Sequence, residues 1–178
     1  MERRKSVRNV SILLFLILII IVFMLIIPIR QALVLEYQNT EKLLAYFPLS
    51  KEAKFKIKYT HSIHLSDVVE SYKITEQAHI QQYELMYEDF AIGMPENASD
   101  GEIFEQKDGK YYLRNMKLDF PFFDLRIGQV RANHTVIFQN KEYTLSDYIE
   151  PGTWVRIKVK RLNFIQQLKG VNILEQST

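Results

Sequence analysis

Residues 54–74, KFKIKYTHSIHLSDVVESYKI, decide the fold, because they contain two alternating segments joined by a short polar loop. In the first segment, lysines alternate with apolar or aromatic residues up to His61, the period of a strand with one buried face. The second segment keeps one apolar phase from Val68 to Ile74 and is interrupted only by Glu70. The stretch therefore predicts an antiparallel hairpin with a histidine and a glutamate on its apolar face.

The hairpin register follows from the same pattern. Placing Ile57 opposite Ile74 and Tyr59 opposite Tyr72 keeps both apolar sets on one face, and residues 64–67 then form a loop of ordinary length. A slip by one residue would turn one strand's apolar set toward water. We therefore expect this register.

This register sets His61 directly opposite Glu70, with Cβ atoms about 4.5–5.5 Å apart. Two interpretations of the pair stay open. In a working site, the carboxylate would orient and charge the imidazole for binding or proton transfer. In a structural brace, the pair would satisfy two buried polar groups and hold the register.

The rest of the outer domain consists of short alternating segments separated by turn residues. ALVLEY and KLLAYF flank QNTE as a first hairpin, and Asp108-Gly109 predicts a two-residue hairpin turn. FDLRIGQV and HTVIF are expected strands around RAN, and TWVRIKVK is the last clear strand. Only SDYI suggests a helical turn. The predicted fold class is all-β, an antiparallel β-sandwich or barrel-like domain.

Residues 9–29 carry no charge and consist mostly of Ile, Leu, Val and Phe. About 20 helical residues span a hydrocarbon core of about 30 Å. Basic residues precede this run, which places the N-terminus in the cytoplasm, and no small-residue cleavage site follows it. We expect an uncleaved signal anchor in the cell membrane. The expected parts are a basic cytoplasmic tail (1–9), a transmembrane helix (10–29), an extracytoplasmic β domain (31–162) and a C-terminal tail with possible room for one strand (163–178).

Charge and cysteine content exclude several classes of protein. The formal net charge is +2, but residues beyond position 30 hold 18 basic and 20 acidic residues, so nucleic acid is not an expected partner. The absence of cysteine excludes disulfides, thiol catalysis and zinc–thiolate sites. Arg156, Lys158 and Lys160 alternate beside Trp154, as on a solvated strand face or one that meets lipid phosphates.

The histidines and serines do not form a recognisable catalytic or metal-binding pattern. His61 and His64 differ in strand parity, and His79 and His134 are isolated in sequence, so no metal or cofactor is expected. Ser62 adjoins His61 but points to the opposite face, and no nucleophile elbow, P-loop or zinc-protease motif is present. We do not predict an enzyme.

The segments YTHSIHLSDVVESYKI, DFAIGMP, DLRIGQVRANHTVIF and PGTWVRIKV, in this order, resemble a family of small membrane-anchored bacterial proteins, the domain of unknown function 1850 family. The resemblance covers about residues 33–160. Members are typically encoded beside the membrane subunits of TAXI-type TRAP transporters. This chain departs from the family at His64, which is not usually histidine, and near Asp67, where a small residue or proline is expected. The positions that resemble the family's motifs are His61, Ser62, Glu70, Gly93, Pro95, Arg126, Gly128 and His134.

The resemblance implies that the chain is encoded beside a transporter, but it implies no chemical mechanism. It favours an accessory of a solute transporter that binds the transporter, its solute-binding protein or the solute. Two alternatives stay open: a cell-envelope interaction protein with an unrelated partner, and a hydrolase-like enzyme that uses His61 and Glu70. We expect a polar cluster at one end of the sheet, either ligand-binding or structural, with bends at the glycines and proline. The expected cluster residues are His61, Ser62, Glu70, Arg126 and His134, and the bend residues are Gly93, Pro95 and Gly128.

Overall fold

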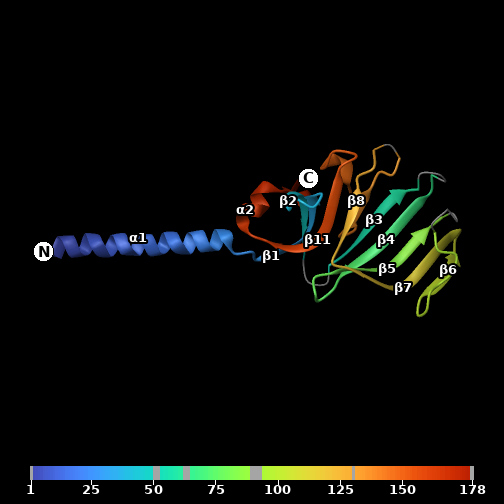
Figure 1. Ribbon diagram of the computed structural model, residues 1–178, viewed down its shortest axis with the longest axis horizontal. Coiled ribbons are helices and arrows are strands. Elements are labelled where there is room, and N and C mark those ends of the chain that lie inside the picture. Colours follow the sequence, from blue (N-terminus) through green and yellow to red (C-terminus); the bar gives the residue numbers. More distant parts are fainter. Residues whose placement is uncertain (1, 50–52, 62–64, 89–93, 130, 177–178) are drawn as a thin grey trace.

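A long N-terminal helix, α1 (Glu2–Ile26), extends away from a folded β domain (Figure 1). The computed structural model describes residues 2–49, 53–61, 65–88, 94–129 and 131–176, except for the side chains of residues 2–8 and 10. α1 covers most of the segment expected to cross a membrane. Within the described part of the chain, no helix is both long and apolar enough to do so.

The β domain contains two sheets, and the smaller has the strand order β12-β2-β1-β11-β8. All its neighbouring strands are antiparallel except β12, which pairs in parallel with β2. Alternation places Leu33 and Leu35 of β1 in the core and leaves Glu36 on the opposite face. The strands are β1 (Arg30–Tyr37), β2 (Lys42–Pro48), β8 (Phe122–Arg126), β11 (Trp154–Leu162) and β12 (Val171–Asn172).

The larger sheet has the order β10-β9-β3-β4-β5-β7-β6 and is antiparallel throughout. With both sheets in place, the prediction of a mainly β, largely antiparallel domain is confirmed. The strands are β3 (Lys54–Thr60), β4 (Asp67–Ile74), β5 (Ile80–Tyr87), β6 (Ile103–Lys107), β7 (Lys110–Phe120), β9 (Thr135–Phe138) and β10 (Lys141–Thr144).

Turn chemistry accounts for the hairpins. Asp108 (φ 51°) and Gly109 (φ 75°) both have positive φ between β6 and β7, as a type I′ turn requires, and this predicted hairpin is confirmed. The predicted β1–β2 hairpin is confirmed as well. The expected strands around RAN both form but do not pair with each other, because β8 joins β11 in the smaller sheet and β9 joins β3 in the larger one.

Short helices complete the described part of the domain. The SDYI region holds the 3₁₀ helix η1 (Leu145–Asp147), which packs Leu145 into the core. After β11 the chain forms α2 (Phe164–Lys169), then β12, then α3 (Ile173–Gln176). Helix α2 was not predicted, because six residues are too few to show a helical period.

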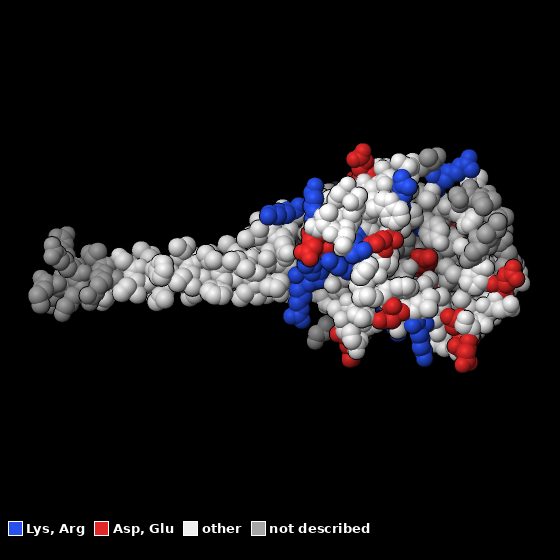
Figure 2. All heavy atoms as spheres, in the orientation of Figure 1, with Lys and Arg blue, Asp and Glu red and all other residues white. Residues whose placement is uncertain are grey.

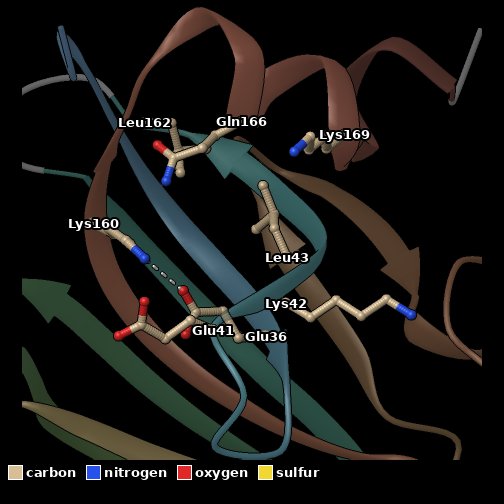
Figure 3. Close-up of a pocket in the computed structure, with 8 residues that line it drawn as sticks. All are labelled: Glu36, Glu41, Lys42, Leu43, Lys160, Leu162, Gln166 and Lys169. Carbon is tan, nitrogen blue, oxygen red and sulfur yellow. Dashed lines mark hydrogen bonds and ion pairs between the residues drawn. The ribbon is translucent and has the colours of Figure 1, made fainter. Parts of the chain in front are cut away.

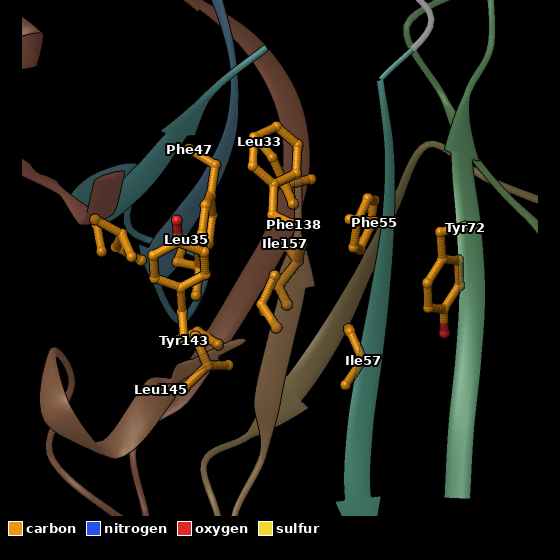
Figure 4. Close-up of a cluster of buried hydrophobic side chains, with 14 of the residues drawn as sticks. Leu33, Leu35, Phe47, Phe55, Ile57, Tyr72, Phe138, Tyr143, Leu145 and Ile157 are labelled. Carbon is orange, nitrogen blue, oxygen red and sulfur yellow. The ribbon is translucent and has the colours of Figure 1, made fainter. Parts of the chain in front are cut away.

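The hydrophobic core lies between the two sheets. Side chains from β1, β2 and β11 meet those from β3, β4 and β9 in one cluster (Figure 4). Phe47 of β2 has its ring centroid 5.6 Å from that of Phe138 and 5.5 Å from that of Tyr143. Tyr72 of β4 stacks on both Phe55 and Phe123, at 5.1 and 5.4 Å. Aromatic contacts therefore join the two layers at more than one point.

We predict that Phe47→Ala destabilises the domain by about 3–5 kcal/mol, because it empties a fully buried ring site between the sheets. Leu118→Ala, at an exposed position of β7, should change stability by less than about 0.5 kcal/mol. Trp154 is the single tryptophan, so its fluorescence during denaturant titration of the detergent-solubilised chain reports the domain alone. Equal effects of the two substitutions would contradict the assignment of Phe47 to the inter-sheet core.

Candidate functional site

The β3–β4 hairpin pairs in a register that differs from the predicted one. Ile57 lies opposite Glu70, where the sequence placed His61, and the last cross-strand pair joins Thr60 to Asp67. His61 lies beyond that pair, at the start of the connecting loop. The predicted cross-strand pair of His61 with Glu70 is therefore wrong.

The loop explains the shift in register. The backbone N–H of His61 donates to the Ser66 carbonyl over 2.8 Å, and the N–H of Leu65 donates to the His61 carbonyl over 2.9 Å. Leu65 has a φ of 56°, in the left-handed region. Strand pairing therefore ends at Thr60 and Asp67, whereas the predicted register continues the pairing up to a four-residue loop at residues 64–67. Both registers keep the same residues on the buried face, so the alternation cannot distinguish them.

Glu70 instead forms a cluster with two tyrosines on the inner face of the larger sheet. The Tyr72 hydroxyl donates to Glu70 Oε2 over 2.6 Å, and the Tyr59 hydroxyl also donates to this carboxylate. Tyr72 packs in the inter-sheet core, and Tyr59 packs against its edge. The two phenols thus occupy the role that the sequence assigned to His61.

Burial dominates the electrostatics of this cluster. It raises the pKa of Glu70 above the usual carboxyl range, and the hydrogen bonds from Tyr72 and Tyr59 oppose that rise without cancelling it. The pKa values of Tyr72 and Tyr59 are both raised, first by burial and then by the neighbouring Glu70 charge. All three groups therefore resist carrying a negative charge, and the phenols keep the protons that they donate.

His134 stands beside this cluster and is held by Gly128. The His134 ring centroid lies 5.6 Å from that of Tyr59. The backbone N–H of Gly128 donates to His134 Nδ1 over 3.1 Å, so the neutral ring carries its proton on Nε2. Burial lowers the pKa of His134, which favours the neutral form of the ring. Of the predicted cluster, the structure thus brings His134 close to Tyr59, one of the two tyrosines that hold Glu70.

Arg126 does not join this cluster. Phe123 and Leu125 pack against the core, so Arg126 on β8 has the outward phase and is exposed. Its Nε donates to the Gly152 carbonyl over 3.3 Å, and its guanidinium lies 6.0 Å from the Trp154 ring. The expected convergence of His61, Glu70 and Arg126 at one end of the sheet is therefore wrong for Arg126.

The remaining motif positions are placed only in part. Pro95 follows β5, and its carbonyl accepts a hydrogen bond from the Tyr87 hydroxyl. Ser62 and Gly93 lie outside the described residues. Gly128 is packed tightly, because a Cβ there would lie 2.8 Å from Ala132 Cβ and 3.0 Å from the Asn133 nitrogen. This close packing gives a steric reason for a glycine at position 128, whereas the predicted bend at Gly128 stays a prediction.

A buried acid on the smaller sheet was not predicted from the sequence. Glu36 is 2% exposed, and its carboxylate binds Lys158 Nζ over 2.7 Å and Lys160 Nζ over 3.1 Å. Figure 3 shows the Lys160 contact at the edge of a pocket beneath α2. Arg156 pairs with Asp124 over 2.8 Å. The alternating basic residues Arg156, Lys158 and Lys160 are therefore ion-paired. The sequence signal for the buried acid was a lone glutamate in a mostly apolar strand.

The two clusters have the chemistry of polar networks whose members satisfy one another. Within the described part of the chain, every buried side-chain nitrogen and oxygen has a hydrogen-bond partner. Among the same residues, no group of three or more His, Asp or Glu side chains could hold a metal ion. Satisfied networks of this kind make a fold rigid and specific. The geometry thus favours the bracing interpretation of Glu70 over the catalytic one.

Gly128→Ala should cost about 1–3 kcal/mol of stability, because the new methyl group would overlap Ala132. Removing the opposing methyl group with Ala132→Gly should relieve part of the overlap. The Gly128→Ala cost measured in the Ala132→Gly background should therefore be smaller, though not zero, since the Asn133 nitrogen remains close. Denaturant titrations of the four proteins give this cycle. Strict additivity would refute the contact.

Glu70→Gln should change the pH dependence of stability. Because the folded-state pKa of Glu70 is raised, its contribution is present at low pH and is lost as pH rises through that pKa. The stability of the natural chain relative to Glu70→Gln should therefore fall as pH rises above about 4, the usual carboxyl pKa.

Asp124→Asn is the control of opposite sign. The hydrogen bond from Arg156 lowers the pKa of Asp124, so its contribution is lost as pH falls. The stability of the natural chain relative to Asp124→Asn should rise as pH rises toward about 4 and stay level above it, because both the folded-state and the unfolded-state pKa of Asp124 lie at or below that value. A rising difference for Glu70→Gln would show that burial does not dominate at Glu70.

The comparisons with known proteins place the chain in a family. No curated protein and no solved structure matches it. The family model described as a domain of unknown function (DUF1850) matches residues 55–145, just over half of the chain. The match spans β3 to β10, which includes the whole larger sheet and β8 but not β1, β2 or β11. The chain therefore belongs to the DUF1850 family, a family defined by a domain of unknown function.

Proposed function

We propose that this chain is a single-pass membrane protein whose β domain is an extracytoplasmic binding module and an accessory of a TAXI-type TRAP transporter. In this proposal, α1 spans the membrane with its basic N-terminal flank in the cytoplasm. The domain binds the transporter, its solute-binding protein or the solute.

The anchor is supported by the sequence of the whole N-terminal segment and by the exposure of α1. Residues 9–29 carry no charge. Large apolar side chains along the described part of α1 are mostly exposed, from 36% at Ile19 to 69% at Met24. An apolar surface of this extent is unstable in water and needs a cover. A bilayer supplies that cover to a helix that is apolar on every side.

The observation that carries the proposal is the short connection between α1 and the domain. α1 ends at Ile26 and β1 begins at Arg30. Such a connection reaches at most about 14 Å when fully extended. A domain on so short a tether stays beside the membrane. Its natural partners are therefore membrane subunits or proteins that dock on them, which fits a transporter accessory.

The internal networks support binding rather than catalysis. Glu70 is hydrogen-bonded by Tyr72 and Tyr59, and Arg126 lies on the outward face of the other sheet. A hydrolase-like mechanism would need His61 within reach of Glu70, but Ile57 occupies the position across the strand. The transporter is favoured as partner by the resemblance to proteins encoded beside TRAP subunits. An unrelated envelope partner is the alternative outcome.

Affinity purification from native membranes tests the proposal. A C-terminally tagged chain should carry TRAP membrane subunits or the solute-binding protein with it after mild detergent extraction. The same tag should be accessible to protease added to intact cells, as the proposed topology requires. A variant with a long Gly/Ser insert after Pro28 is the matched control. It keeps every domain residue but frees the domain from the membrane surface, so it should retain less of the partner.

Two results would overturn the proposal separately. Release of the protein from membranes by alkaline carbonate would refute the proposal that α1 is a membrane anchor. Purification of the intact anchored chain without any TRAP component would refute the role as a transporter accessory and favour an unrelated partner.

A further inference from the structure

Helix α2 presents its apolar side to the outside. Phe164, Ile165 and Leu168 are 50%, 40% and 72% exposed, and their spacing places them along one side of the helix. Gln166 and Gln167 are half-buried against the domain. A surface helix of a globular protein normally has the opposite arrangement. The exposed side of α2 therefore has the composition of a contact surface.

This helix is held in place by the domain itself. The Asn163 side chain accepts from the Gln166 N–H over 2.8 Å, and Gln166 Oε1 accepts from the Asn163 N–H over 3.0 Å, which forms a complete capping box. The Tyr46 hydroxyl donates to the Gln167 carbonyl over 3.5 Å. The apolar side of α2 is thus preformed and costs little ordering entropy when it meets a partner.

α2 lies at the foot of α1. The two helices are in contact, and Figure 1 shows α2 beside the domain-side end of α1. Ile27 and Ile29, in the connection to β1, are 46% and 73% exposed. The apolar surface of α1 therefore continues through the connection onto α2.

Basic side chains flank this apolar surface, and Glu41 and Glu175 lie among them. Figure 2 shows Lys and Arg gathered where the helical stem meets the domain. Arg30 lines a pocket on one side of α2 together with Phe164 and Leu168. Lys169 lines the pocket of about 340 Å³ on the other side, together with Lys42, Glu36 and Glu41 (Figure 3). Arg30 and Lys169 thus form a basic rim at two edges of the apolar side of α2, and an apolar centre with basic edges matches a bilayer of acidic headgroups above acyl chains.

We propose that α2 is a second membrane contact, which inserts Phe164, Ile165 and Leu168 into the interface of an anionic bilayer. Its basic rim contacts lipid phosphates, and the two contacts together fix the orientation of the β domain on the membrane. The inference rests on the proposed anchoring by α1. It adds a docking surface and a lipid class that the anchor alone does not require.

The test places a tryptophan on α2. The full chain carrying Trp154→Phe and Phe164→Trp is reconstituted into phosphatidylcholine vesicles with roughly one third phosphatidylglycerol. Some vesicles contain lipids brominated near the headgroup end of the acyl chains. Insertion by about 5–10 Å should bring the indole to the bromines and lower its fluorescence at least about twofold. Leu118→Trp in the same background is the control, because position 118 is exposed on β7.

Further variants test the apolar side and the lipid charge. Adding Ile165→Ser and Leu168→Ser should reduce quenching of the Phe164→Trp probe, while circular dichroism confirms that the domain stays folded. Replacing phosphatidylglycerol with phosphatidylcholine should also reduce quenching. Equal quenching with and without phosphatidylglycerol would overturn the role of the basic rim.

Flotation of the vesicles separates this inference from the anchor. A protein that does not float refutes the anchor. A protein that floats, with the α2 probe quenched no more than the Leu118→Trp control, overturns the second contact and leaves the anchor intact. The tryptophan emission could instead be blue-shifted to an extent that depends on the protein-to-lipid ratio, with no quenching by the brominated lipids. That result would show that a second copy covers α2, which also overturns the proposal.

Discussion

The stack of Phe55, Tyr72 and Phe123 is the interaction on which the rest of the domain depends. Phe55 and Tyr72 are directly opposed on β3 and β4, so their stacking belongs to the hairpin register itself. Phe123 comes from β8, in the other sheet, and its stacking on Tyr72 joins the two layers. The Tyr72 hydroxyl then holds Glu70. One aromatic ring thus takes part in register, layer packing and the placement of a buried acid.

The sequence predicts the strands and their buried faces well, because alternation and turn residues are local signals. It fails at the β3–β4 register for a physical reason. The predicted and observed registers both keep Phe55, Ile57 and Tyr59 on the buried face, so burial energy alone separates them weakly. What separates them is the aromatic stack across the sheets and the conformation of Leu65, and neither is a local pattern.

The candidate site was predictable to a similar extent. Glu70 was identified as an exception to the apolar pattern, but its partners were not, because the phenols of Tyr59 and Tyr72 were counted as core. Glu36 was missed because a single acid at the end of an apolar strand looks like a terminus. Its burial follows from the lysine stems of β11, which lie over the same outer face and pair with it. Hydrogen-bond partners on other strands require the sheet topology.

The position of β1 in the smaller sheet has a consequence for how the domain assembles. β1 lies between β2 and β11, so the first strand of the domain needs one of the last as its neighbour. The seven-stranded sheet lies between them in the sequence. During synthesis, the β1–β2 hairpin must wait with one edge unpaired until β11 emerges, and such non-local closure is slow. Until then the open edge of β1 is a template for wrong pairing, which makes early nascent chains of this protein natural clients of a holding chaperone.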